Sequence, residues 1–138
     1  MGKRSTSRRL AMQAVYQAEI SGEGIEQALK NVLSAQEFIP ETREFAESLA
    51  RSSWDKREEN DKIVAGLSID WSLDRISKVD RSILRIALQE LNEAGTPVSV
   101  AVDEAVELAK KYSSEEAAKF INGILGAYLR SKAGLRKQ

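Results

Sequence analysis

The sequence contains no cysteine and no histidine. Without cysteine the chain can form no disulfide and no thiolate metal site. Without histidine it lacks the commonest general base and the commonest metal ligand. The sequence also has no P-loop, no glycine-rich dinucleotide motif, no HExxH zinc motif and no nucleophile elbow. These absences indicate that the protein is not an enzyme, and we expect neither a cofactor nor a metal ion.

Long apolar stretches are absent as well. No apolar run approaches the ~18 residues of a membrane-spanning helix, and the basic start is not followed by the uninterrupted apolar segment of a secretory signal. With 138 residues, of which 42% are hydrophobic, the chain is long enough for one domain with a full core. We therefore expect a single cytoplasmic domain over residues 1–138 that does not associate with a membrane.

The net charge is zero, but the charge is unevenly distributed. Residues 1–9 carry four bases and no acid, residues 110–138 carry seven bases and two acids, and residues 37–62 carry eight acids and five bases. We expect a flexible basic arm over residues 1–7 and a basic tail over residues 133–138. Two basic ends on a neutral protein suggest a local site for a polyanion, and the alternative is that these ends are merely solvated.

Apolar residues recur along most of the chain at the three- and four-residue spacing of helices. We expect a first helix that is capped by Ser5 or Ser7 and ends at Ser21-Gly22. A short second helix over residues 25–33 and a long third helix from Pro40 to Leu67 should follow. We then expect a short helix over residues 71–76, one from Asp80 to Leu91 that stops before Gly95-Thr96-Pro97, and two more between Val98 and Leu129. No strand pattern competes with them. The sequence therefore predicts an all-α bundle of about seven helices.

Several side chains have two interpretations. Trp54 is either a core residue, which we favour because aromatic rings bury large areas, or a surface contact for a partner. Arg81 and Arg85 form either a solvated face or part of a functional surface. Gly123 and Gly126 are unusual inside a helix. They indicate either close approach of another helix, which we favour, or a bare strip of backbone against a ligand.

Two of the expected helices meet at a polar corner, residues 110–116, that combines two lysines with Tyr112. Ser113 followed three residues later by Glu116 fits a capping box, so we expect the last helix to start there. Cations, an aromatic ring and the free N–H groups of a helix N-terminus suit a phosphate backbone and an unstacked base. The corner is therefore the candidate nucleic-acid site.

The helix before this corner carries three carboxylates, Asp103, Glu104 and Glu107. They could bracket a metal ion, or they could be a solvated face. No second carboxylate cluster is placed opposite them in the sequence, so we expect no metal site.

Three segments resemble the NusB family of bacterial transcription antitermination proteins. The segment from Val79 to Leu91 reads VDRSILRIALQEL and resembles the family's central helix. The segment from Pro97 to Leu125 resembles its C-terminal signature, and SRRLAMQAVYQAE, from Ser7 to Glu19, resembles its arginine-rich first helix. The chain differs from the family pattern at Asp103, where asparagine is usual. The resemblance covers most of the chain and implies an all-helical fold of two packed three-helix groups.

The resemblance also implies a function and partners. It implies binding of single-stranded RNA, the boxA element of ribosomal-RNA leader transcripts, together with the ribosomal protein NusE, in a complex that joins elongating RNA polymerase. By matched position it places the RNA-binding surface near the first helix and at the polar corner. The residues are Arg4, Arg8, Arg9, Tyr112, Glu116, Lys119 and Phe120. NusE would bind the long third helix and the helix from Asp80 to Leu91.

These residues have distinct expected roles. Tyr112 and Phe120 would stack on splayed bases, although Phe120 fits the apolar stripe of its helix equally well. Glu116 would accept a hydrogen bond from a base amino group. The four basic residues would contact phosphates and make the affinity salt-dependent.

Two other functions remain open. NusB-like helical domains also form the N-terminal part of ribosomal-RNA cytosine methyltransferases. Because no α/β segment and no cysteine nucleophile is present before Gln138, we expect a stand-alone module instead. The other alternative is a helical protein-interaction scaffold without sequence-specific RNA binding, in which homodimerisation buries apolar surface. The sequence does not distinguish a monomer from a dimer.

Overall fold

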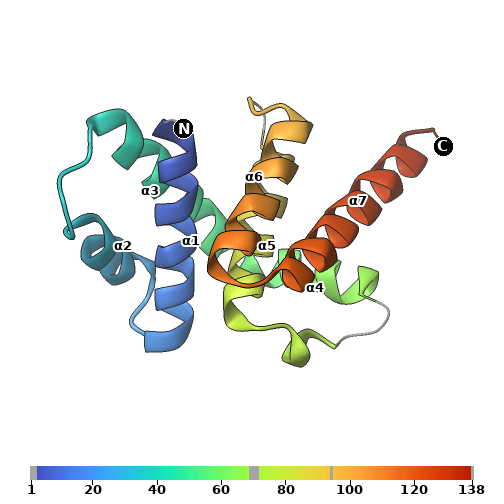
Figure 1. Cartoon of the computed structure of the whole chain (residues 1–138), viewed down its shortest axis with the longest axis horizontal. Helices are drawn as coiled ribbons and strands as arrows, with labels where there is room; N and C mark the ends of the chain where they lie inside the picture. The colour runs from blue at the N-terminus through green and yellow to red at the C-terminus, as the bar shows by residue number, and fades with distance from the viewer. Residues whose placement is uncertain (1–2, 69–71, 94, 138) are drawn as a thin grey trace.

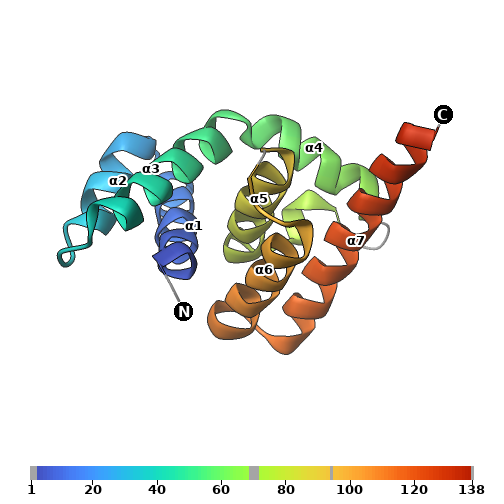
Figure 2. The same cartoon turned by 90° about the horizontal axis from the view of Figure 1, so that it is seen from above.

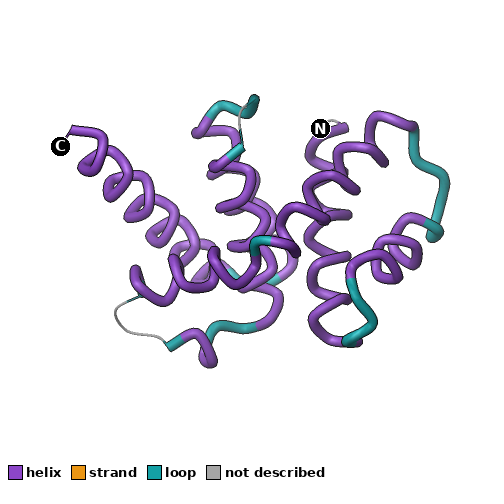
Figure 3. The backbone as a smooth tube through the Cα atoms, turned by 180° about the vertical axis from the view of Figure 1, so that it is seen from behind, coloured by secondary structure: helices purple, strands orange, loops and turns teal. Residues whose placement is uncertain are grey.

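The computed structural model describes the backbone of residues 3–68, 72–93 and 95–137. Within these ranges the chain forms seven α-helices, one 3-10 helix and no strand (Figures 1 and 3). The α-helices are α1 (Lys3–Ser21), α2 (Ile25–Leu33), α3 (Pro40–Asp55), α4 (Arg57–Leu67), α5 (Lys78–Asn92), α6 (Val98–Tyr112) and α7 (Glu115–Lys137), and the 3-10 helix is η1 (Leu73–Arg75). The prediction of an all-α bundle of about seven helices is confirmed. None of the described helices is long and apolar enough to span a bilayer.

The helices pack as two groups (Figure 2). Helices α1, α2 and α3 form the N-terminal group, and α5, α6 and α7 form the C-terminal group, with α4 packed on α5 and α7. Figure 2 shows α3 and α4 following each other along one side of the molecule, so that they connect the two groups. Helix α1 also contacts α5 and α6 directly across the junction. The arrangement confirms the two packed three-helix groups that the resemblance implied.

Helix α5 lies at the centre of the core because it contacts α1, α3, α4, α6 and α7. Its predicted apolar stripe is buried, and Ile83, Leu84 and Leu88 have no exposed surface. The largest fully buried partners from other helices are Leu10 and Val15 on α1, Val64 on α4, and Ile121 and Leu125 on α7. The core is therefore continuous across both groups.

Helix α1 begins earlier than the sequence predicted. Its first residue is Lys3, so both serines expected as caps lie inside the helix. Ser7 is fully buried, and its hydroxyl donates a hydrogen bond to the backbone carbonyl of Thr42 on α3 over 2.9 Å. The prediction of a flexible arm over residues 1–7 is therefore wrong for residues 3–7, because packing against α3 and α6 continues the helix there.

The long third helix expected from Pro40 to Leu67 is two helices, α3 and α4, separated at Lys56. No proline or glycine marks the break, so the sequence pattern could not predict it. Trp54 packs against the core beside the break, which confirms its interpretation as a core residue. The Arg57 guanidinium covers the ring, 3.9 Å from its centroid.

The short helix expected over residues 71–76 is only partly described. Trp71 lies outside the described residues. The remaining segment forms the single 3-10 turn η1, and Ile76 after it is buried against the core.

Helices α5 and α7 are each capped by a serine near the predicted N-cap residue rather than by that residue itself. Helix α5 begins after Ser77, whose hydroxyl accepts a hydrogen bond from the Asp80 backbone N–H over 3.1 Å, so Asp80 lies in the first turn. Helix α7 begins after Ser114, whose hydroxyl accepts from the Ala117 N–H over 3.0 Å, whereas the predicted cap, Ser113, ends α6. Both helices therefore keep a serine cap and an acidic first turn, at corrected positions.

Arg85 on α5 is only 4% exposed, so its interpretation as part of a solvated face is wrong. Its guanidinium donates to both carboxylate oxygens of Asp61 on α4, over 2.9 and 2.7 Å, and to Glu19 on α1 over 2.8 Å. Arg81 donates to the backbone carbonyl of Leu73 over 2.7 Å. Arg85 thus links α4 and α5 to the N-terminal group through charge.

Helix α7 continues through the backbone of residues 133–137, where the sequence suggested a separate tail. A Cβ atom added at Gly123 would meet no atom within 4 Å, and one added at Gly126 would meet only the Nη1 atom of Arg130, at 3.3 Å. No neighbouring helix approaches either glycine closely, so the favoured interpretation of these residues is wrong.

Replacing Gly123 with alanine is therefore expected to stabilise the protein by about 1 kcal/mol, because alanine loses less backbone entropy in an exposed helix. Gly123 is exposed and helical. Urea unfolding measures the change. A loss of stability in this variant would show that the glycine meets a packing requirement.

Candidate nucleic-acid interface

A groove of about 390 Å³ lies between α1 and α6. It brings together Arg9 and Tyr112, two predicted RNA-binding residues from opposite ends of the sequence. Tyr112 ends α6 with 36% of its surface exposed. The full lining is Ser5, Thr6, Arg9, Glu104, Glu107, Leu108, Lys110, Lys111 and Tyr112. An aromatic ring and several cations thus share one surface hollow.

The two carboxylates in this groove are paired. Glu104 accepts hydrogen bonds from the Ser5 hydroxyl and, over 3.2 Å, from Arg8. Glu107 lies 3.7 Å from the Lys110 ammonium. Both carboxylates are therefore already engaged, and the part of the chain that the structure describes contains no group of three or more acidic side chains arranged to hold a metal ion.

The remaining two cations of the groove are available to a ligand. Arg9 makes one long hydrogen bond, over 3.4 Å, to Gln13 on its own helix. The Lys111 ammonium lies 5.5 Å from the centroid of the Tyr112 ring. Cations beside an accessible aromatic face can bind a phosphate backbone while a base stacks on the ring.

Arg8 is only 4% exposed, so the prediction that it contacts phosphate directly is wrong. Its Nε atom lies 2.8 and 3.1 Å from the two carboxylate oxygens of Glu90, and its Nη2 atom lies 2.6 Å from Glu90 Oε2. Its Nη1 atom donates to Glu104 over 3.2 Å. Burial alone would lower the pKa of Arg8, but hydrogen bonding and attraction to Glu90 outweigh it and leave the pKa raised. The guanidinium is charged and engaged within the protein.

Arg4 lies on the side of α1 that faces α3. Its exposed guanidinium stacks over the Phe45 ring, 4.1 Å from the centroid. Both residues line hollows along α1 and α3 rather than the groove between α1 and α6. The charge of Arg4 is accessible, but the fold does not place it in the groove with Tyr112.

Glu116 and Phe120 line a second hollow, of about 360 Å³, where the first turns of α7 face η1 and the start of α5. Phe120 is half-buried and packs against the core, which confirms its place in the apolar stripe, and it also lines this hollow, so stacking on a base stays a prediction. Lys119 is exposed and makes no hydrogen bond or ion pair with the described residues. The lining is Arg75, Ile76, Ser77, Asp80, Ser114, Glu116, Ala117 and Phe120.

Sequence reasoning missed one cation that lines the second hollow, Arg75, because only tertiary packing brings η1 beside α7. Lys110 and Lys111, which line the first hollow, belong to the predicted polar corner, although the family resemblance did not name them.

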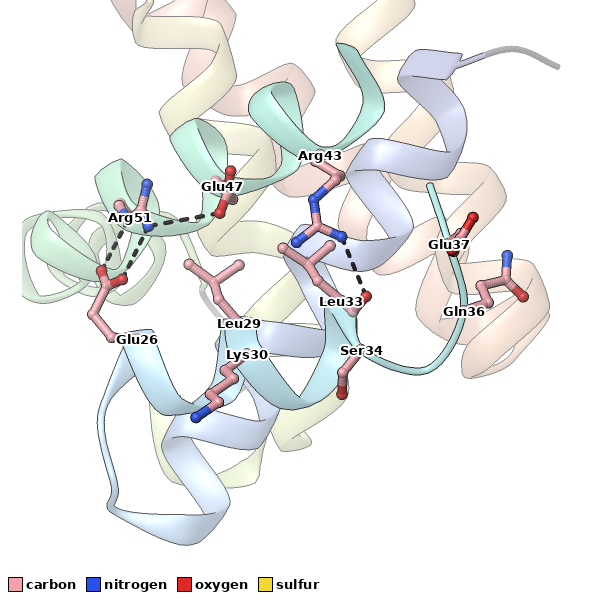
Figure 4. Close-up of a pocket in the computed structure, with 10 residues that line it drawn as sticks. All are labelled: Glu26, Leu29, Lys30, Leu33, Ser34, Gln36, Glu37, Arg43, Glu47 and Arg51. Carbon is pink, nitrogen blue, oxygen red and sulfur yellow. Dashed lines mark hydrogen bonds and ion pairs between the residues drawn. The ribbon is translucent and has the colours of Figure 1, made fainter. Parts of the chain in front are cut away.

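A hollow of about 580 Å³ between α2 and α3 contains none of the predicted site residues (Figure 4). Arg51 donates to both carboxylate oxygens of Glu26, over 2.8 and 3.0 Å, and lies 3.8 Å from Glu47. Arg43 donates to the backbone carbonyl of Leu33 over 3.4 Å. Because both arginines here are engaged within the protein, the groove between α1 and α6 is the better candidate for a polyanion.

The chain is similar to known proteins over almost its whole length. Residues 5–130 match the model of the NusB family. The curated transcription antitermination protein NusB of Anaeromyxobacter sp. (strain Fw109-5) is 43% identical over 124 residues, which cover 89% of this chain and 87% of the relative.

Solved structures share the fold. A chain in the crystal structure of a plectonemic RNA supercoil matches with a TM-score of 0.89 and 29% identity, covering 96% of this chain and 98% of that one. A chain in the crystal structure of the antitermination factors NusB and NusE in complex with dsRNA matches with a TM-score of 0.87 and 28% identity, covering 95% and 98%. Because the family match spans most of its residues, the chain belongs to the NusB family.

Proposed function

We propose that the chain is a transcription antitermination factor of the cytoplasm. It binds single-stranded boxA RNA of ribosomal-RNA leader transcripts together with NusE and joins elongating RNA polymerase. The observation that carries this proposal is family membership, since its curated relatives are transcription antitermination proteins. A structurally similar chain was crystallised with NusE and double-stranded RNA. The curated relatives that match over this length are antitermination proteins, so the chain is not an enzyme.

The groove between α1 and α6 supports a specific binding mode. Arg9 and Lys111 contact phosphates, and a base stacks on Tyr112 between them. In the second hollow Glu116 accepts from a base amino group, and Phe120 supplies an apolar face. The proposed RNA-binding residues are Arg4, Arg9, Lys111, Tyr112, Glu116, Lys119 and Phe120.

NusE supplies the remaining affinity in this proposal. The chain has no net charge and offers few free cations in the groove, so its affinity for RNA alone is low. NusE binds the surface of α3, α4 and α5 and extends the basic surface that contacts the RNA. Simultaneous binding of RNA by both proteins then raises the affinity without new contacts in this chain.

Binding of short RNAs tests this function. We would titrate the protein with boxA RNA, a scrambled strand of the same composition and a duplex of the boxA sequence, at two salt concentrations, with and without NusE. Selective binding of the boxA strand that tightens with NusE is the expected result. Equal binding of both strands, or none even with NusE, would contradict it and favour a protein-interaction scaffold. Preference for the duplex would contradict the single-strand assignment alone.

Replacing Tyr112 with alanine is expected to weaken RNA binding by about tenfold, which lies within the ~1–3 kcal/mol attributed to one stacked base. The thermal midpoint should change little because the side chain is exposed. Tyr112→Phe is the matched control, since it keeps the ring and should retain the affinity. Unfolding of Tyr112→Ala, or unchanged RNA affinity, would show that the residue has no stacking role.

A further inference from the structure

A negative side chain stands in the groove that the proposed function assigns to phosphates. The Glu104 carboxylate is 25% exposed, and it lines the groove together with Arg9 and Tyr112. An unpaired carboxylate there would repel the phosphate backbone. Any contact that offsets this charge therefore favours RNA binding in the groove.

Arg8 offsets part of this charge from below the surface. Its Nε and Nη2 atoms bind Glu90 on α5, and its Nη1 atom reaches Glu104 on α6 over 3.2 Å. One planar guanidinium thus serves two carboxylates on different helices, which its fork of donors permits. The Ser5 hydroxyl also donates to Glu104 and fixes the carboxylate against α1.

We propose that Arg8 is a positioning residue for RNA binding. It does not touch the RNA. It weakens the repulsion between Glu104 and the phosphates and holds α6 against α1, so that Arg9 and Tyr112 face one groove. This inference rests on the function proposed above.

Lysine cannot replace arginine in this role. An ammonium is a compact point charge and cannot form the two-sided contact of a guanidinium. In Arg8→Lys the cation would remain beside Glu90, where the shortest contacts are. Glu104 would then lose its charged partner and keep only the Ser5 hydroxyl. We expect the affinity for single-stranded RNA to fall about fivefold, which corresponds to the repulsion of unit charges near 4 Å in water.

A second substitution should reverse this loss. Glu104→Gln removes the unpaired charge, so Arg8→Lys combined with Glu104→Gln is expected to regain the wild-type affinity. Glu104→Gln alone should bind RNA slightly more tightly than the wild type. The gain in affinity when Glu104→Gln is added to Arg8→Lys must exceed the gain that Glu104→Gln gives in the wild type. Rescue of this kind separates positioning from a direct phosphate contact, because the loss of a direct contact would persist whether or not Glu104 carries a charge.

Arg85→Lys is the matched control. Arg85 is as buried as Arg8 and also bridges two carboxylates, but it lies outside the groove. This variant should lose stability without losing RNA affinity. All affinities would be measured for boxA RNA and for an oligouridylate of equal length, at a temperature where circular dichroism shows every variant to be folded.

The outcomes distinguish the inference from the function. A wild-type protein that binds neither RNA, even with NusE present, would overturn both. Two results would overturn the inference alone, provided that the wild type binds RNA. Either Arg8→Lys keeps the wild-type affinity, or it loses affinity that Glu104→Gln does not restore. If Arg8→Lys does not fold, Ser5→Ala removes the other partner of Glu104. It should give a smaller loss of affinity that Glu104→Gln also rescues, and absence of that rescue would equally overturn the inference.

Discussion

Replacing Arg85 with methionine is expected to lower the free energy of unfolding by about 3 kcal/mol, near the low end of the range for breaking a buried ion pair. The substitution would leave the carboxylates of Asp61 and Glu19 without their guanidinium at the junction of the two helix groups. Their side chains are 15% and 28% exposed, so water can partly solvate them, and this limits the loss. Urea unfolding at neutral pH measures the change.

The same ion pair makes stability depend on pH. The hydrogen bond from Arg85 holds the pKa of Glu19 below its ordinary value of 4.5. The folded protein therefore keeps this carboxylate charged at pH values where the unfolded chain takes up a proton. The stabilisation is complete above about pH 4.5 and is lost as the pH falls below it. Arg85→Met should show a weaker pH dependence in that window, and an unchanged slope would show that Glu19 is not coupled to Arg85.

Replacing Leu88 with alanine is expected to lower the free energy of unfolding by about 2–5 kcal/mol, the range for a large-to-small change in a closed core. Leu88 has no exposed surface and lies on α5, the helix that contacts both groups. Neighbours from several helices cannot all move into the space, so a cavity adds to the lost burial. Leu84, which is equally buried, should behave similarly.

A matched truncation on the surface provides the control for Leu88. Ile20 on α1 is 53% exposed, and Ile20→Ala should change the stability by no more than about 0.5 kcal/mol. Guanidinium unfolding of both variants gives the comparison. Equal losses at Leu88 and Ile20 would contradict the assignment of α5 as the centre of the core.

The fold could be predicted where the sequence records burial locally. The stripe on α5 and the Gly95-Thr96-Pro97 stop after it were read correctly, because burial of one helix face imposes a period on the sequence. The break at Lys56 carries no such record, since neither proline nor glycine lies beside it. The early start of α1 depends on a hydrogen bond from Ser7 to Thr42, which no local pattern reveals.

The candidate site was less predictable, because its contacts also join residues that are far apart in the sequence. Arg8 and Arg9 are neighbours, and both were predicted to contact phosphates. Successive helix residues point ~100° apart, so Arg8 turns toward α5 while Arg9 lines the groove with Tyr112. The main partner of Arg8, Glu90, lies 82 residues away in the sequence. A separation of that kind is visible only after the helices have packed.

The ion pairs between α1 and α5 are reciprocal, and this has a consequence for how α1 docks. Helix α1 supplies a cation near its start, Arg8, and an anion near its end, Glu19. Helix α5 supplies the anion Glu90 for the first and the cation Arg85 for the second. If α1 lay on α5 in the reverse direction, arginine would face arginine and glutamate would face glutamate. The apolar stripe of α1, made of small and aliphatic residues, would pack in either direction. The charges therefore favour the observed orientation of α1 on α5 over the reverse one.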